Sequence, residues 1–292
     1  SEILKERLTS VENKTPWEKI RGTRQMTRPC ALDYIDYICE DFHEIHGDRT
    51  MNDDKAIVGG IGHIDGQPVT VIAQVKGSSM TECMERNFGM PLPDGYRKAL
   101  RLMKQAEKFN RPIITFVNTP GAFCGLEAEE RGQGEAIAKN LAEFMSLKTP
   151  VVSVVLGEGG SGGALALGVC DDLAMLENAL YSVISPRGAA SILWKDAARE
   201  REACEIMRIT AQDLLEFGVA DAIIPEPEDG AQGDLDKMSQ NIKEYLVKTI
   251  AVKSKKDIDI LQKERYTKFR KIGVFSEPSH EVQKAAAGNE NE

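Results

Sequence analysis

The clearest pattern in the sequence is a pair of apolar runs, AIVGGIGHI (56–64) and QPVTVIAQV (67–75), joined by Asp65-Gly66. An Asp-Gly dipeptide between two apolar runs is the strongest short signal of a β-hairpin, because these residues tolerate the positive φ angles of a tight turn. We therefore expect two antiparallel strands here, at the start of a sheet.

Beyond the hairpin, apolar strands, glycine-rich turns and helices follow one another. IITFV (113–117) leads through NTPGAFCG to a helical pattern over residues 137–147, and VVSVVL (151–156) leads through GEGGSGG to the short helix ALALGVC (164–170). Further strands are expected at LAMLE and LYSVI, with further helices at SPRGAASILW and after Thr210. This alternation predicts an α/β fold.

Residues 76–95 are interrupted by glycines and prolines, so they predict a long loop, the kind of segment that often carries function. A helix is expected to begin at about Tyr96. Its basic residues Arg97, Arg101 and Lys104 recur at helical spacing. Two interpretations stay open for them: a solvated basic face, or a contact surface for an anionic ligand or a partner.

The ends of the chain differ in pattern from its middle. Residues 1–46 combine helical apolar spacing with many charges, and residues 235–275 do the same after a loop rich in proline, glycine and acidic residues. Residues 276–292 are polar enough to be disordered. We expect an N-terminal helical segment, a central α/β domain over residues 47–234, a C-terminal helix and a disordered tail.

Composition narrows the classes of function. The chain has 292 residues, with 37 Lys and Arg against 46 Asp and Glu, a formal charge of -9 that disfavours specific nucleic-acid binding and attraction to anionic membranes. Its apolar runs are shorter than the roughly 18 residues that span a bilayer, so we expect a cytoplasmic protein. The six cysteines are scattered without a C-x-x-C pair, which predicts reduced thiols and no metal site in this chain.

The glycine run at residues 157–163, GEGGSGG, fits two familiar patterns. As G-x-G-x-x-G it would bind a dinucleotide, but the acidic residue expected about 20 positions further on is badly placed. As G-x-S-x-G it would make Ser161 the nucleophile of a hydrolase, which requires a downstream histidine. Only His280, in the polar tail, lies beyond Ser161, so both interpretations are disfavoured.

A third interpretation uses the backbone instead of side chains. Glycines permit close approach, and a helix that begins at this run directs free N–H groups at a ligand. The turn TPGAFCG (119–125) ends the preceding strand in the same manner. Two adjacent strand ends that aim N–H groups at one point form an oxyanion site, suited to an enolate or a tetrahedral intermediate. The alternative is two tight turns whose glycines only relieve strain.

Longer segments resemble one family in order and spacing: residues 86–116, 119–122, 129–141, 157–168, 175–186 and 191–197. From about Pro16 to Gly273 the chain resembles the alpha subunits of bacterial acetyl-CoA carboxylase carboxyltransferase. The resemblance implies a crotonase-like ββα superhelix with helical N- and C-terminal extensions. It also implies biotin-dependent transfer of a carboxyl group from carboxybiotin, carried on biotin carboxyl carrier protein, to acetyl-CoA, which gives malonyl-CoA for fatty acid synthesis.

The resemblance assigns roles by position. The backbone oxyanion donors are Gly121, Ala122, Gly162, Gly163 and Ala164. The residues that shape the substrate and carboxybiotin site are Phe123, Glu129, Arg131, Gln133, Gly159, Gly160 and Ser161. Arg97, Arg101 and Lys104 become candidates for contact with CoA or a partner.

The same resemblance implies several partners. These are a zinc-ribbon beta subunit in an alpha2beta2 assembly, biotin carboxyl carrier protein and biotin carboxylase. Four positions depart from the family pattern: this chain has Asn118 where the family usually has Asp, Cys124 where it has Pro, Gly134 where it has Ser, and Arg187 where it has Glu. Because of these departures the acyl group stays open, and a related biotin-dependent carboxyltransferase or decarboxylase that acts on another acyl group is the alternative.

Overall fold

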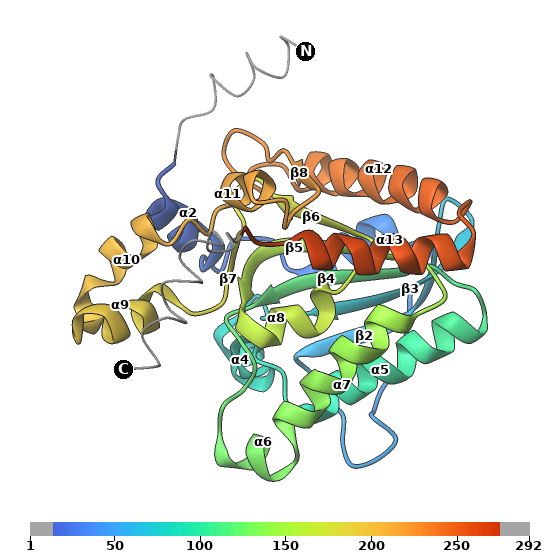
Figure 1. Cartoon of the computed structure of the whole chain (residues 1–292), viewed down its shortest axis with the longest axis horizontal. Helices are drawn as coiled ribbons and strands as arrows, with labels where there is room; N and C mark the ends of the chain where they lie inside the picture. The colour runs from blue at the N-terminus through green and yellow to red at the C-terminus, as the bar shows by residue number, and fades with distance from the viewer. Residues whose placement is uncertain (1–13, 275–292) are drawn as a thin grey trace, which may run out of the picture.

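The computed structural model describes residues 14–274 and contains one eight-stranded sheet in the order β1-β2-β3-β4-β5-β6-β8, with β7 paired to β5 (Figure 1). The strands are β1 His43–Glu44, β2 Ile57–Ile64, β3 Gln67–Gln74, β4 Ile113–Thr119, β5 Val151–Gly160, β6 Asp172–Leu176, β7 Leu180–Ser182 and β8 Ala222–Ile224. The pairs β1–β2 and β2–β3 are antiparallel, and the other pairs are parallel.

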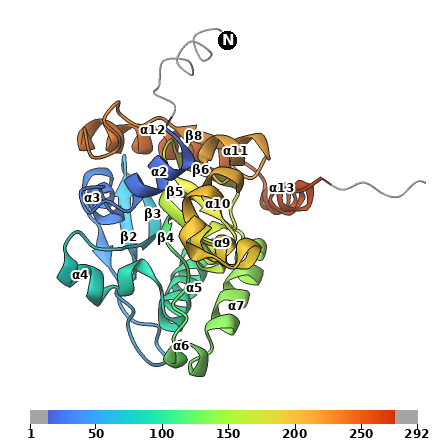
Figure 2. The same cartoon turned by 90° about the vertical axis from the view of Figure 1, so that its left-hand side faces the viewer.

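Helices cover both faces of the sheet. They are α2 Pro16–Thr23, α3 Ala31–Ile38, α4 Met80–Glu85, α5 Pro93–Lys108, α6 Leu126–Glu130, α7 Gln133–Ser146, α8 Ser161–Gly168, α9 Pro186–Trp194, α10 Glu200–Ile206, α11 Ala211–Glu216, α12 Leu235–Lys253 and α13 Ile258–Lys271, with 3₁₀ turns η1 Asn87–Gly89 and η2 Ala197–Arg199. Helices α5 and α8 pack on the sheet with α7 outside them, while α3 and α12 cover the opposite face (Figure 2). Helices α9 and α10 form an arm beside this body.

The predicted hairpin is confirmed. Strands β2 and β3 pair from Ile57 with Gln74 to Ile64 with Gln67, and the turn residues Asp65 and Gly66 have φ angles of 49° and 74°. Positive φ at both positions is the requirement of the hairpin turn that the Asp-Gly dipeptide predicts. The alternation of strands and helices is confirmed as well, because β4 and β5 lie at the centre and are buried on both faces, as expected of parallel strands.

Two predicted boundaries were wrong. Residues 76–95 are not one long loop, because Ser79 caps helix α4 by accepting a 3.2 Å hydrogen bond from the Glu82 N–H, and α5 begins at Pro93 rather than at Tyr96. Proline suits the first helical position because its fixed φ matches the helix and no N–H is needed there. Strand β5 also continues through the glycine run to Gly160, held by pairing with β4 and β7.

At the N-terminal end, the predicted helical segment contains α2 and α3, and also the short strand β1, which the sequence pattern missed. Residues 1–13 and the predicted disordered tail lie outside the described residues. The limits of the central domain at residues 47–234 stay a prediction.

At the C-terminal end, the charged segment forms two helices instead of one. Arg265 of α13 anchors the second helix by donating to both Asp171 oxygens, at 2.8 and 2.7 Å, and to the backbone carbonyls of Phe144, Leu147 and Thr149 at the end of α7 and just after it. No helix within residues 14–274 has the length and apolar character needed to cross a membrane.

Candidate active site

The two glycine turns meet backbone to backbone at the carboxyl ends of β4 and β5. A methyl group added at Gly160 would overlap the Pro120 carbonyl, and one added at Gly163 would overlap the backbone of Gly121 and Ala122. Only glycine allows this close approach. The predicted proximity of the two turns is therefore confirmed.

Helix α8 begins at Ser161, directly after the strand, so the predicted start at Ala164 was wrong. The N–H groups without an intrahelical partner therefore belong to the first positions, Ser161, Gly162 and Gly163. Ala164 is fully buried and is the fourth residue of the helix. The role of Ala164 as a backbone donor stays a prediction.

Ser161 occupies a special backbone position at this junction. It is exposed and has a φ angle of 51°, in the left-handed region that favours glycine. The histidines of residues 14–274 do not approach it, since His43 and His63 lie on β1 and β2, which β3 and β4 separate from β5, and His46 pairs with Asp53. The described residues thus supply no histidine base for a nucleophilic Ser161.

A buried ionic network supports the strand end beneath the turns, and the sequence reading missed it. Glu158, 8% exposed, accepts hydrogen bonds from Lys76 Nζ at 2.5 Å and from Arg24 Nε at 2.9 Å. Its backbone N–H donates to Asn118 Oδ1 at 3.2 Å. Burial alone would raise the pKa of Glu158, but Lys76 and Arg24 outweigh it and hold the pKa below its usual value. Glu158 therefore fixes the glycine run against α2, β3 and β4.

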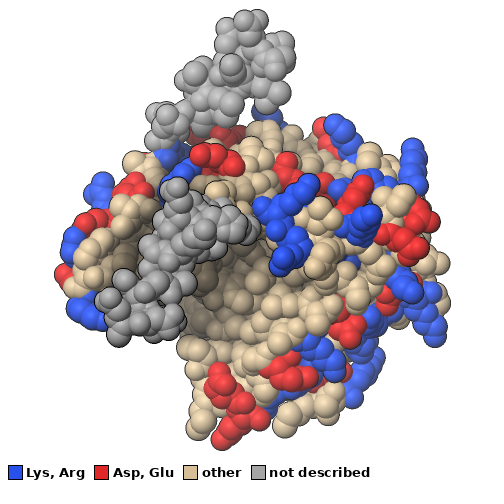
Figure 3. Space-filling model, viewed as in Figure 1, with Lys and Arg blue, Asp and Glu red and all other residues tan. Residues whose placement is uncertain are grey.

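The space at the turns within this chain is small. A cavity of about 20 Å³ is bordered by Pro120, Gly159, Gly160, Arg24 and Glu158, and that volume holds about one water molecule. Figure 3 shows a hollow in the surface between the arm formed by α9 and α10 and the part of the molecule that carries α8. Few charged side chains are visible in this hollow. The cavity at the turns is too small to hold a substrate.

Comparison with known proteins decides the family. Residues 2–273 match the family model described as acetyl co-enzyme A carboxylase carboxyltransferase-like. The chain belongs to this family. It is 57% identical over 263 residues to a carboxyl transferase subunit alpha of Clostridium acetobutylicum, covering 90% of this chain and 96% of the relative. It is also 58% identical over 265 residues to the carboxyl transferase subunit alpha of Shouchella clausii, a match that covers 91% of this chain and 82% of the relative.

Another member of the family joins two subunits in one chain. The carboxyl transferase subunits beta/alpha of Clostridium tetani are 54% identical over 275 residues, which cover 94% of this chain and 48% of that relative. This chain therefore corresponds to about half of the joined protein.

Solved structures of carboxyltransferases confirm the crotonase-like fold. Transcarboxylase 12S superposes with a TM-score of 0.60 at 20% identity, over 82% of this chain and 46% of that chain, so this chain spans about half its length. A Pseudomonas malonate decarboxylase hetero-tetramer in complex with coenzyme A gives a TM-score of 0.62 at 17% identity, over 80% of this chain and 91% of that chain. At these identities the likeness concerns the fold alone.

Several residues that the family resemblance assigned to the carboxyltransferase site make structural contacts within the chain, and their roles in binding stay a prediction. Gln133 is buried and donates through Nε2 to the carbonyls of Pro91 and Phe123, both at 2.8 Å. Arg131 pairs with the fully buried Asp94 and with Glu127. Gln133 thus fixes the loop that carries Phe123, Arg131 joins α5 to α6, and Glu129 is exposed.

The basic residues of α5 make their contacts inside the chain. Arg97 donates to the Arg131 carbonyl, Arg101 donates to the carbonyls of His46 and Gly47, and Lys104 pairs with Glu107 and Glu143. These contacts join α5 to neighbouring segments, and contact of the same residues with CoA or a partner stays a prediction.

Of the four departures from the family pattern, only Asn118 enters the network at the turns. Cys124, Gly134 and Arg187 are exposed. Because these three residues are exposed, another residue at any of them would disturb little of the packing within this chain.

Proposed function

We propose that this chain is the alpha subunit of an acetyl-CoA carboxylase carboxyltransferase, which transfers the carboxyl group of carboxybiotin to acetyl-CoA and yields malonyl-CoA for fatty acid synthesis. The observation that carries the proposal is the contact between the two glycine turns at the start of α8, in a chain of this family. A reconstituted transfer assay with acetyl-CoA tests it.

The turns suit this chemistry because the reaction generates negative charge on oxygen. Carboxybiotin, when bound, supplies the carboxyl group. The N–H groups of Gly162 and Gly163, at the positive end of α8, are fixed donors for an oxygen on which charge develops. Gly121 and Ala122 lie against Gly163 and extend the same wall. Such donors need no side-chain nucleophile.

A beta subunit supplies the opposite wall in this proposal, within an alpha2beta2 assembly in the cytoplasm. The small cavity at the turns and the relatives that join beta and alpha in one chain support it. We place the zinc ribbon in the beta subunit. Biotin carboxyl carrier protein and biotin carboxylase complete the set of partners.

The departure at Asn118 supports one alternative, a transferase or decarboxylase that acts on another acyl group, because this residue contacts the Glu158 backbone at the turns. Comparing the transfer of ¹⁴C-carboxyl groups to acetyl-, propionyl- and butyryl-CoA separates the two. Preference for acetyl-CoA is the result we expect. Preference for a longer acyl group would replace acetyl-CoA in the proposal.

A further inference from the structure

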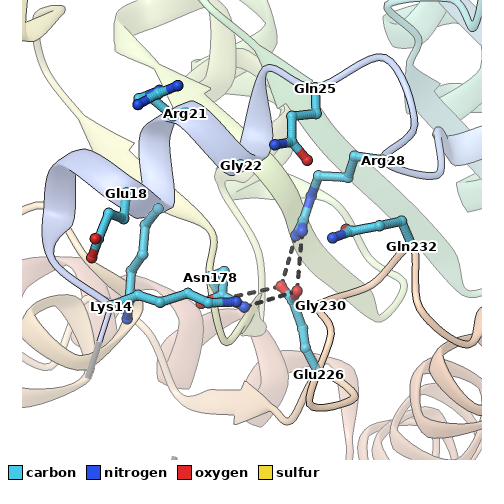
Figure 4. Close-up of a pocket in the computed structure, with 11 residues that line it drawn as sticks. Lys14, Glu18, Arg21, Gly22, Gln25, Arg28, Asn178, Glu226, Gly230 and Gln232 are labelled. Atoms are coloured by element: carbon cyan, nitrogen blue, oxygen red, sulfur yellow. Dashed lines mark hydrogen bonds and ion pairs between the residues drawn. The ribbon is translucent and has the colours of Figure 1, made fainter. Parts of the chain in front are cut away.

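A second and larger cavity, of about 670 Å³, lies beside α2 (Figure 4). Ile20 of α2 and its C-cap residue Arg24 border the small cavity at the turns, whereas Glu18, Lys19, Arg21 and Gly22 of α2 border the larger one. At 100° per residue these two sets lie on opposite sides of the helix. The larger cavity is therefore separate from the proposed carboxyl-transfer site, and its volume is that of a small-molecule site.

The carboxylate of Glu226 at this cavity has no free bonding capacity. Its two oxygens accept from Arg28 Nη1 and Nη2 at 3.0 and 2.7 Å, from the Asn178 backbone and side chain at 3.1 and 3.0 Å, and from the Ala231 N–H at 2.9 Å. Figure 4 shows Arg28 and Asn178 directed at it from two sides. Arg28 and Glu226 form a close ion pair, so Glu226, like Glu177 and Asp213, acts on Lys19 only from beyond ion-pair distance.

Lys19 is a buried cation at the same cavity without an adjacent counter-ion. It is 8% exposed, and its ammonium donates to two neutral oxygens, Gln212 Oε1 at 2.6 Å and the Glu177 carbonyl at 3.3 Å. Within residues 14–274 it forms no ion pair at 4.0 Å or less, so the carboxylates that act on it do so from further away. Burial lowers the pKa of Lys19, which agrees with incomplete compensation.

Two more cations border the cavity. Lys14 and Arg21 form no ion pair within the described residues, and Gln25 and Gln232 add amide groups. Glu18 is the remaining acid, and its carboxylate accepts from the Thr15 N–H at 2.8 Å in the helix cap. A buried charge that lacks a partner is unfavourable, and an anion placed among these cations would compensate it.

We propose that this cavity binds a small phosphate-bearing molecule, whose phosphate group contacts the Lys19 ammonium and is approached by Arg21 and Lys14. Phosphate fits better than a single carboxylate because it carries up to two charges and several acceptor oxygens for these donors. The volume leaves room for more than a free phosphate ion. The proposal does not depend on the acyl-transfer function.

The test is calorimetric binding of two probes, inorganic phosphate and adenosine 3′,5′-bisphosphate, to the full chain at constant ionic strength. The variant Lys19→Met replaces the ammonium with an apolar group of similar length, and Lys139→Met is the control because Lys139 is exposed on α7. Wild type and Lys139→Met should bind a probe equally. Lys19→Met should weaken binding at least about tenfold, the usual effect of losing a charged hydrogen-bond partner.

The free protein gives a second readout that keeps the test independent of folding losses. Without phosphate, Lys19→Met should melt no lower than wild type, since it removes a buried charge. Phosphate should then raise the Tm of wild type and of Lys139→Met but not that of Lys19→Met. Tighter binding of the bisphosphate identifies a nucleotide-type ligand, and equal or tighter binding of phosphate identifies the free ion. Binding of neither probe, or equal binding by Lys19→Met and wild type, overturns the proposal.

Discussion

The variant Glu158→Gln tests whether the buried network holds the glycine turns in place. Glutamine keeps the shape of the side chain but removes the charge that Lys76 and Arg24 share. Losing one member of a buried ion pair costs about 3–5 kcal/mol. Since the Arg24 side chain is 43% exposed and screened by solvent, we take the lower end, about 3 kcal/mol. That corresponds to a fall in Tm of about 6–12 °C for a chain of this size.

The measurement is thermal unfolding followed by circular dichroism, with Glu202→Gln as the matched control. Glu202 also pairs with an arginine, Arg199, but both side chains are at least 40% exposed, so the control should leave the Tm nearly unchanged. The double variant Lys76→Met/Glu158→Gln should be more stable than the sum of the single effects predicts, because it removes both charges of the pair. Equal Tm values for Glu158→Gln and the control would refute the reasoning.

Activity should fall with stability, because Glu158 stands between Gly157 and Gly159 and its displacement misplaces the turn. We expect kcat of the assembled Glu158→Gln enzyme to fall roughly 10- to 100-fold at a temperature where it is folded. Full activity of the folded variant would show that the network supports stability alone.

Further predictions concern stability, the turn and pH. Arg265→Met leaves Asp171 buried without its cation, so urea unfolding should show a loss of about 3–5 kcal/mol. Gly163→Ala should lower kcat by roughly 10²-fold or more, because the added methyl separates the two turns, whereas Ser161→Ala should retain most activity in the same carboxyl-transfer assay. Because the pKa of Glu158 is lower in the folded chain than its usual 4.5, its contribution to stability is present above that pH and should be lost as the pH falls further, as urea titrations between pH 5 and 3 would show.

The sequence predicted those features that depend on neighbouring residues. The hairpin at Asp65-Gly66 and the turn at Gly121 follow from local backbone requirements, so composition and spacing were sufficient. Gly163 was marked by the glycine run, although its need for glycine comes from the contact with Gly121 and Ala122. The start of α8 was misplaced because the glycines at 157–160, poor strand formers by propensity, are held in β5 by pairing with β4 and β7. Tertiary pairing decided that boundary.

The ionic contacts could not be predicted because their partners are distant in sequence. Arg24 and Glu158 are 134 positions apart, and Lys76 reaches the same carboxylate from the end of β3. The available signal was a single glutamate, Glu158, within a glycine run. Its ion pair with Arg24 could not be predicted without knowing where α2 lies. The basic spacing of Arg97, Arg101 and Lys104 was visible, but whether they contact solvent, a ligand or their own chain depended on the packing of α5.

The most direct test of the proposed function combines the purified chain with its beta subunit, carboxylated biotin carboxyl carrier protein and acetyl-CoA, and follows ¹⁴C-carboxyl transfer into malonyl-CoA. Light scattering of the same mixture reports the assembly. We predict transfer by an alpha2beta2 complex and none by either subunit alone. Transfer by this chain alone, or none by the complete mixture, would contradict a site shared between two subunits.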